Sequence, residues 1–282
     1  MLVTIQRLGF LVTSCAVVLS CSSTPNHPLP TERAVETFNL IENNNTLFIE
    51  KETGFVKKKN EFVVKQQIFE NKNLAKGGKA LERIITVSTL GSLNKKVNVL
   101  RPKISQYQVW FEGKKHFTET KIDVTKRSLE VKSEGPEDKW NSKKTFPFPQ
   151  GTGVFCYFSQ VIECLAVTGF IKLAQDKKTG TINFHIIWES YPFIQEHYSN
   201  MTPEVFSEAQ MTYDGDTEEK ETRFALQVGN QNIVYMLDKN NKLSRMFWVA
   251  QGVSQIKYSQ NKAESKDNSE KGEDLFDTTQ IH

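Results

Sequence analysis

The chain has 282 residues, of which 38% are hydrophobic and 24% are charged, and its formal net charge is +3. This length and composition suffice for one domain with a substantial core. The small net charge excludes the class of strongly basic proteins, so any charged binding surface must be local.

The first twenty residues have the three regions of a secretory signal peptide. Residues 1–7 carry one cation, Arg7, residues 8–19 are apolar, and Ser20 is the small residue expected before a cleavage site. An apolar run of this length is shorter than the roughly 20 residues that span a bilayer as a helix. The sequence therefore predicts a signal peptide over residues 1–20, not a transmembrane anchor.

The letters VLSC at positions 18–21 resemble a bacterial lipobox, in which the cysteine becomes the lipidated mature N-terminus. The resemblance implies a lipoprotein with a diacylglycerol and an amide-linked acyl chain such as palmitate on Cys21. Ser22, in place of a retaining aspartate, implies the outer membrane. Two alternatives remain: lipidation at Cys15, behind a shorter apolar run, and ordinary cleavage near residues 22–24.

The segment after Cys21 predicts a tether. Residues 22–30 (SSTPNHPLP) contain three prolines and no apolar periodicity. Two or more acyl chains hold a protein stably on a membrane, so residues 21–30 would connect a membrane-anchored Cys21 to the domain that follows.

Alternation of apolar and polar residues recurs through residues 31–259 and predicts a single, mainly β domain. Phe184, Ile186 and Trp188 share one face of a predicted strand, and Phe224 and Leu226 share one face of another. Residues 232–250 predict a hairpin whose turn contains two asparagines, which tolerate the left-handed conformation. Strands at this spacing, with few helical stretches between them, favour a curled antiparallel sheet or half-barrel.

Residues 151–175 interrupt this pattern because their apolar residues surround the segment on all sides. We expect one long apolar helix near residues 152–174, with a bend at Gly169, packed against the concave face of the sheet. A membrane span is disfavoured by Glu163 near its centre. Phe158 on this helix, together with Phe184, Ile186, Trp188, Phe224 and Leu226, is then expected to line the lumen.

A curled sheet that holds an apolar helix on a lipidated tether is similar to the bacterial superfamily of half-barrel lipoprotein carriers and lipoprotein receptors. The resemblance rests on architecture alone and carries no specific motif. It implies a lumen that binds acyl chains and assigns no ligand-contacting residue.

The two cysteines inside the domain, Cys156 and Cys164, leave two alternatives. Eight residues of continuous helix would separate their Cα atoms by about 12 Å, whereas a disulfide needs about 7 Å or less. We expect free buried thiols in a continuous helix; the alternative is a disulfide, which would require the helix to be broken between them.

Charge is distributed unevenly along the chain. Residues 51–103 contain 13 Lys and Arg against 4 acidic residues, and residues 204–238 contain 8 acidic residues against 2 basic ones. A basic surface in an envelope compartment favours lipid headgroups, an anionic glycan or an acidic protein as partner, with nucleic acid unexpected there. The alternative is that these charges only solvate surface strands. Residues 260–282 are polar and acidic and predict a disordered tail.

No catalytic, metal or cofactor motif occurs: there is no G-x-S-x-G and no HExxH, and the histidines are scattered. The leading hypothesis is a non-enzymatic binding or assembly accessory of the envelope, with a lipid, a lipidated protein or an anionic glycan as ligand. The alternatives are a structural envelope lipoprotein that engages a partner through its sheet surface, and a hydrolase with an unrecognised site.

Overall fold

The computed structural model describes residues 33–42, 44–93, 95–150, 153–198, 200–201 and 204–258. The predicted signal peptide (1–20), the lipidation site Cys21, the tether (21–30) and the acidic tail (260–282) lie outside the described residues.

The described residues form one open sheet of 15 strands in the order β8-β7-β6-β5-β4-β3-β2-β1-β15-β14-β13-β12-β11-β10-β9. Neighbouring strands are antiparallel, except that β9 runs parallel to β10. The first eight strands are β1 (Ala34–Glu42), β2 (Asn45–Val56), β3 (Glu61–Phe69), β4 (Glu82–Leu93), β5 (Val97–Phe111), β6 (Lys114–Asp123), β7 (Ser128–Glu134) and β8 (Ser142–Pro147). The remaining strands are β9 (Phe155–Tyr157), β10 (Thr181–Ile187), β11 (Phe206–Asp216), β12 (Thr222–Val228), β13 (Gln231–Leu237), β14 (Leu243–Trp248) and β15 (Val253–Lys257).

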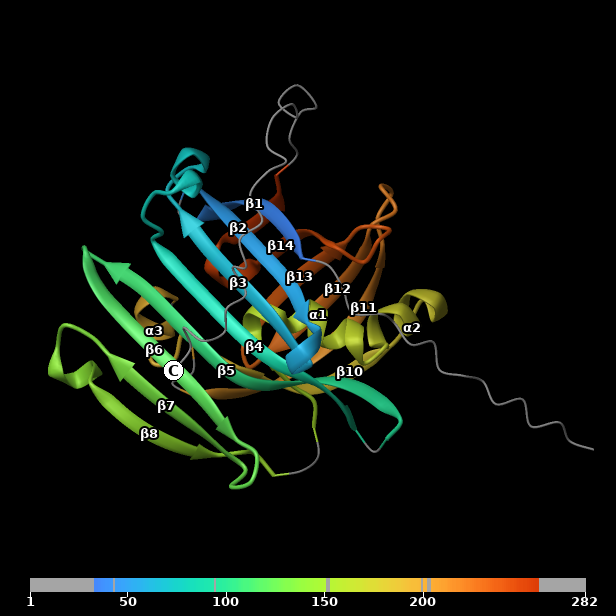
Figure 1. Ribbon diagram of the computed structural model, residues 1–282. Coiled ribbons are helices and arrows are strands. Elements are labelled where there is room, and N and C mark those ends of the chain that lie inside the picture. The colour runs from blue at the N-terminus through green and yellow to red at the C-terminus, as the bar shows by residue number, and fades with distance from the viewer. Residues whose placement is uncertain are drawn as a thin grey trace, which may run out of the picture.

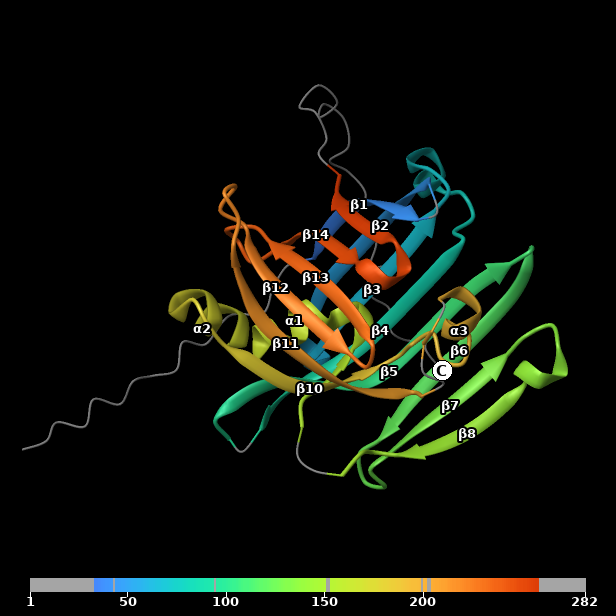
Figure 2. The ribbon, with the colours of Figure 1, turned by 180° about the vertical axis from the view of Figure 1, so that it is seen from behind.

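The sheet curls so that β1–β5 and β10–β15 form two facing walls, with helices between them (Figures 1 and 2). The short strand β9 returns to lie against β5, and the hydroxyls of Tyr157 on β9 and Thr120 on β6 are 3.4 Å apart. Strands β6–β8 continue beyond this closure as an extension of one wall. The prediction of a mainly β fold built on a curled, almost wholly antiparallel sheet is confirmed.

The alternating pattern of the sequence corresponds to the two faces of the strands. Phe184 and Ile186 on β10 and Phe224 and Leu226 on β12 are buried in the main core. The predicted hairpin is present as β13 and β14, which pair Ile233 with Trp248. Its turn has Asn241 in the left-handed region (φ +60°), as the sequence indicates.

The helices are short: α1 (Val161–Val167), α2 (Phe170–Lys177) and α3 (Ile194–His197), with 3₁₀ helices η1 (Lys57–Lys59), η2 (Lys72–Lys76), η3 (Asp138–Trp140), η4 (Phe158–Gln160) and η5 (Val249–Gln251). The expectation of one long helix over residues 152–174 is wrong. The segment begins as β9, turns through η4, and continues as α1 and α2. Gly169 separates the two helices in the left-handed conformation (φ +82°), which glycine adopts without steric cost.

The physical reason for this error is that apolar side chains on every side indicate enclosure without specifying helix or strand. Here the first part of the segment is enclosed as a strand between β10 and β5. Among the described residues, no helix has the length and apolar character needed to cross a membrane.

Candidate functional site

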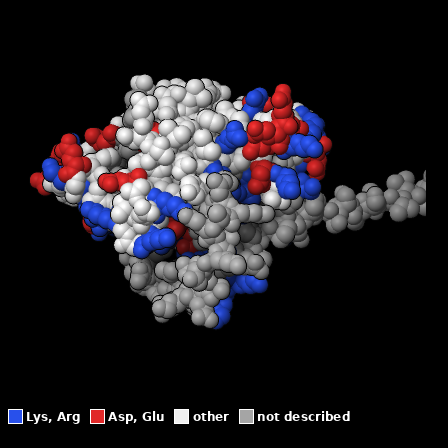
Figure 3. Space-filling view, turned by 90° about the horizontal axis from the view of Figure 1, so that it is seen from above, with Lys and Arg blue, Asp and Glu red and all other residues white. Residues whose placement is uncertain are grey.

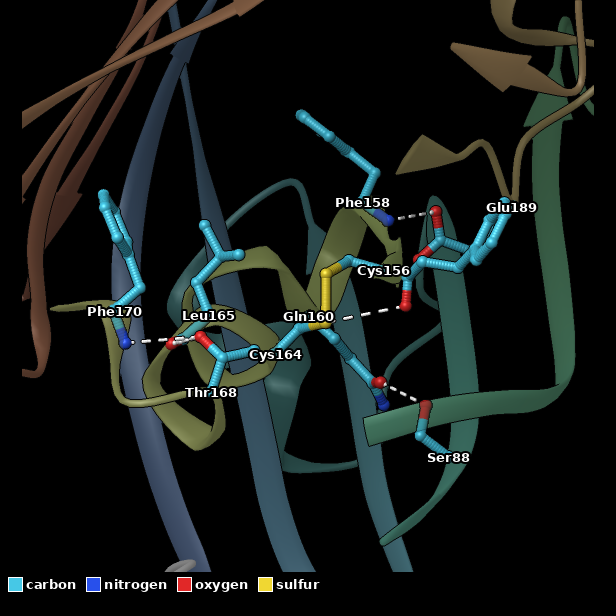
Figure 4. The surroundings of a disulfide bond; sticks show 10 residues. Ser88, Cys156, Phe158, Gln160, Cys164, Leu165, Thr168, Phe170 and Glu189 are labelled. Carbon is cyan, nitrogen blue, oxygen red and sulfur yellow. Dashed lines mark hydrogen bonds between the residues drawn. A yellow bond between two sulfur atoms is a disulfide. The ribbon is translucent and has the colours of Figure 1, made fainter. Parts of the chain in front are cut away.

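The 3₁₀ turn η4, between β9 and α1, is held by one buried carboxylate. Glu189 Oε1 accepts hydrogen bonds from the backbone N–H of Ser159 (2.9 Å) and from its hydroxyl (2.6 Å), and Oε2 accepts from the N–H of Phe158 (3.2 Å). Figure 4 shows the Glu189 side chain directed at the start of this turn. Because it satisfies these donors, Glu189 fixes where the chain leaves β9 and where α1 begins.

Gln160 fixes the same turn to the opposite wall of the barrel. Its side chain is buried, accepts a hydrogen bond from the Ser88 hydroxyl on β4 (2.7 Å), and donates to the carbonyl of Thr86 (3.4 Å). This polar pair is buried, so leaving either partner unpaired would be costly.

Lys51 on β2 provides a third connection to this segment. Its ammonium group donates to the carbonyl of Ser159 (3.0 Å) and forms an ion pair with Glu163 on α1 (2.7 Å). Both side chains are largely buried, so removal of one charge would leave the other uncompensated. The turn and the start of α1 are thus fixed from both walls.

Cys156 and Cys164 form a disulfide with a Cα–Cα distance of 5.9 Å, so the expectation of free thiols is wrong. Cys156 lies on β9 and Cys164 on α1, and the chain reverses through η4 between them. The expected Cα–Cα separation of about 12 Å applied to a continuous helix. Because η4 interrupts the segment, the two Cα atoms come close enough for a disulfide.

A cavity of about 110 Å³ remains between η4, α1 and the concave face of the sheet. The apolar part of its wall comes from both sides of the barrel: Leu40, Ile49, Ile68, Ile84, Val161, Ile162, Ile194, Leu243, Met246 and Val253. Six aromatic side chains complete it: Tyr107, Phe158, Trp188, Tyr198, Tyr235 and Trp248. The helices therefore fill the barrel only in part.

The aromatic side chains of the cavity pack closely against one another. The Phe158 ring lies 4.7 Å from Trp188 and 5.5 Å from Trp248, and Tyr198 lies 4.7 Å from Trp248, measured between ring centroids. The indole N–H groups are used outside the cavity: Trp188 donates to Ser207 and Trp248 to Gln231, both at 2.9 Å. The ring faces are therefore left for apolar contact.

Three charged residues line the cavity: Lys51, Glu82 and Glu189. The Tyr107 hydroxyl donates to Glu82 Oε2 at 3.3 Å. Burial raises the pKa of Glu189 above its ordinary value, despite the opposing effect of the Ser159 hydrogen bonds. Burial also raises the pKa of Tyr107, and the neighbouring Glu82 carboxylate adds to this shift.

Of the six side chains expected to line a lumen, five are buried in the main core and Phe158 is half-buried against it. Only two of the six border this cavity. Phe158 and Trp188 form part of its wall. Ile186, Phe224 and Leu226 pack in the main core, where Phe224 lies 6.1 Å from Phe170 of α2. Phe184 borders a separate, open groove between the end of β8 and strands β10 and β11.

Sequence patterns did not single out Lys51, Glu82 or Glu189. Strict alternation placed Glu189 on the face opposite Trp188. However, β10 ends at Ile187, so the alternation stops before either residue. A charged residue directly after an apolar strand is the one available signal, and it is common at surfaces as well.

Within the described residues, no group of three or more His, Cys, Asp or Glu side chains could hold a metal ion. Comparison with known proteins gives little further information. No family model matches the chain, and no curated protein matches it. The chain is similar to a solved β-barrel-like protein of the domain of unknown function DUF1849 from Brucella abortus, with 7% identity and a TM-score of 0.39. The match covers 80% of this chain and 94% of that one.

Proposed function

We propose that this protein is a non-enzymatic binding protein of the bacterial envelope, which holds a neutral apolar chain, such as part of a lipid, in the cavity beneath η4. The observation that carries the proposal is the cavity itself: an aromatic and aliphatic space left between a curled sheet and the helices that partly fill it.

The size and charge of the cavity define the ligand. One water needs roughly 10–15 Å³ of such space, so about 110 Å³ accepts a short section of an alkyl chain. Glu82 and Glu189 disfavour a ligand that brings its own carboxylate, and the ammonium group of Lys51, which also lines the cavity, is already paired with Glu163. A neutral chain, as in an acyl ester, therefore fits better than a free fatty acid.

Binding is favoured over hydrolysis by the way the polar groups are used. The contact that most resembles a catalytic pair is the one between Ser159 and Glu189, yet both oxygens of Glu189 already accept backbone N–H groups that define the turn. None of the described residues that line the cavity is a histidine. These groups support a structural role, and the hydrolase hypothesis gains no support.

Anchoring through Cys21 and an outer-membrane location complete the proposal. They are supported by the VLSC motif behind an apolar run. The Cys156–Cys164 disulfide is in keeping with an oxidising compartment such as the envelope.

Tryptophan fluorescence provides a test, because the four tryptophans divide into two pairs. Trp188 and Trp248 border the cavity, whereas Trp110 lies beneath Lys79 and Trp140 packs on Phe193. In a Trp110→Phe/Trp140→Phe variant, which leaves the cavity intact, bromododecanol should quench the remaining emission saturably. Bromododecanoate, with its carboxylate, should bind more weakly.

The matched variant is Trp188→Phe/Trp248→Phe, whose emission comes only from the distant pair. We expect no saturable quenching there. Equal quenching in the two variants, or none in the first, would contradict binding in the cavity.

A further inference from the structure

One end of the β2–β5 wall carries a concentration of basic residues. The connection from β2 to β3 is the 3₁₀ turn Lys57–Lys59, and all three lysines are exposed. Asn60, which ends the turn, donates its side-chain amide to the carbonyl of Leu90 on β4 (2.8 Å). The lysines are therefore held at a fixed place beside the end of β4.

Two further connections bring cations to the same end. The β4–β5 hairpin extends beyond β3, pairs Leu93 with Val97, and exposes Lys95 and Lys96. The β6–β7 connection exposes Lys126 and Arg127. We call Lys57, Lys58, Lys59, Lys95, Lys96, Lys126 and Arg127 the basic rim. In Figure 1 the β4–β5 hairpin lies at the lower right, and the acidic β11–β12 connection lies across the barrel at the upper right.

Acidic neighbours near the basic rim are already paired. Glu61, next to the lysine turn, is buried and forms an ion pair with Lys103 (2.6 Å). Asp123 pairs with Lys126 (3.6 Å). Seen from above, the visible acidic and basic side chains of the described residues lie intermingled (Figure 3). Residues 57–60, 94–96 and 124–127 contain seven Lys and Arg and no acidic residue. Even with Lys126 offset by Asp123, the rim therefore keeps an excess of positive charge.

The rim also exposes large apolar side chains. Val97, on the β4–β5 hairpin, is 37% exposed, and Val124, in the β6–β7 connection, is 69% exposed. Val35, at the start of β1, is 53% exposed and pairs with Glu52 near the end of β2. Cations with interspersed exposed apolar residues match the chemistry of a bilayer interface, whereas a soluble anionic glycan would use only the charges.

The described chain begins at this same end. Ala34 pairs with Thr53, four residues before Lys57. Residues 22–33 lie between Cys21 and Ala34 and reach at most roughly 40 Å when fully extended. A lipid on Cys21 would keep Ala34, at this end of the sheet, within that distance of the membrane.

We propose that the basic rim docks directly on a bilayer that contains anionic lipid headgroups and so sets the orientation of the barrel on the membrane. The proposal rests on the envelope location given above, but it requires neither lipidation nor an occupied cavity. Attraction of basic residues to anionic headgroups and burial of the valines in the interface would act together.

The test uses the full chain with Cys15→Ser/Cys21→Ser, so that neither candidate lipidation site carries an acyl chain. Binding is measured by co-sedimentation with vesicles of phosphatidylcholine with or without phosphatidylglycerol. We expect binding only to vesicles with phosphatidylglycerol, and its loss at high salt. Adding Lys57→Gln/Lys58→Gln/Lys59→Gln should weaken binding on the order of 100-fold.

The matched control is Lys72→Gln/Lys76→Gln/Lys79→Gln, which removes three lysines at the opposite end of β3. It should leave binding nearly unchanged. Equal loss in the two triple variants would indicate non-specific attraction and overturn the proposal, as would absence of binding at low salt. If the protein bound soluble polygalacturonate as tightly as it binds the vesicles, and Val97→Ser/Val124→Ser left vesicle binding unchanged, the partner of the rim would be an anionic glycan and the membrane proposal would be overturned. Quenching in the cavity is measured separately, so failure of one proposal leaves the other testable.

Discussion

The Ser159 hydroxyl donates a 2.6 Å hydrogen bond to Glu189 Oε1 across 30 residues of sequence. This contact joins η4, the turn before α1, to Glu189, two residues after the end of β10. It places the buried Glu189 carboxylate at the wall of the cavity. Desolvation there disfavours the charged form and raises the pKa of Glu189, whereas the hydrogen bonds favour the charged form and partly offset this rise.

Glu189→Gln should lower the free energy of unfolding by about 1–3 kcal/mol, because one backbone N–H would then face an amide NH₂ group. The raised pKa of Glu189 means that the folded state binds this proton more tightly than the unfolded state does. Protonation of Glu189 therefore adds to the free energy of unfolding. This contribution is complete below the pKa that Glu189 has in the unfolded state, and it declines as pH rises through the pKa that it has in the folded state. The difference in free energy of unfolding between wild type and Glu189→Gln should therefore become smaller as pH rises from 4 to 7.

Urea unfolding across this pH range measures the difference. Glu130→Gln, at a half-exposed ion pair with Lys143, is the matched control and should change little at any pH. Parallel profiles for wild type and Glu189→Gln would refute the assignment of this titration to Glu189.

The Cys156–Cys164 disulfide should stabilise the fold by about 2–3 kcal/mol, as expected from the loop entropy of eight residues. A Cys156→Ser/Cys164→Ser variant should unfold at a correspondingly lower urea concentration. In the wild-type chain unfolded without reductant, peptide mapping should find no maleimide on either cysteine. Cys156→Ala should make Cys164 reactive under the same conditions, and labelling of both wild-type cysteines would disprove the bond.

Cys21→Ser should abolish metabolic labelling with palmitate and release the protein from the membrane pellet, because the acyl chains would have no attachment site. Cys15→Ser is the matched control and should leave both properties intact. The reverse result would move the lipidation site to Cys15. Retention of label in both single variants would exclude a lipobox at either position.

The sequence by itself determined the strands and their faces. Alternation in residues 182–188 and 224–228, and the asparagine-containing turn before β14, depend on local periodicity and turn chemistry, which the residues carry with them. The location of positive charge in residues 51–103 was also apparent, since charge needs no fold to be counted.

Only the tertiary structure decided what residues 153–177 become. An apolar segment gains similar burial as helix or strand, and here the free edge of β10 and the facing surface of β5 make Phe155–Tyr157 a strand. That choice brings Cys156 to Cys164 and turns Ser159 toward Glu189. It also leaves the cavity beside Phe158. The sequence could not predict these long-range contacts, because they depend on which elements meet in the fold and produce no periodic pattern in the chain.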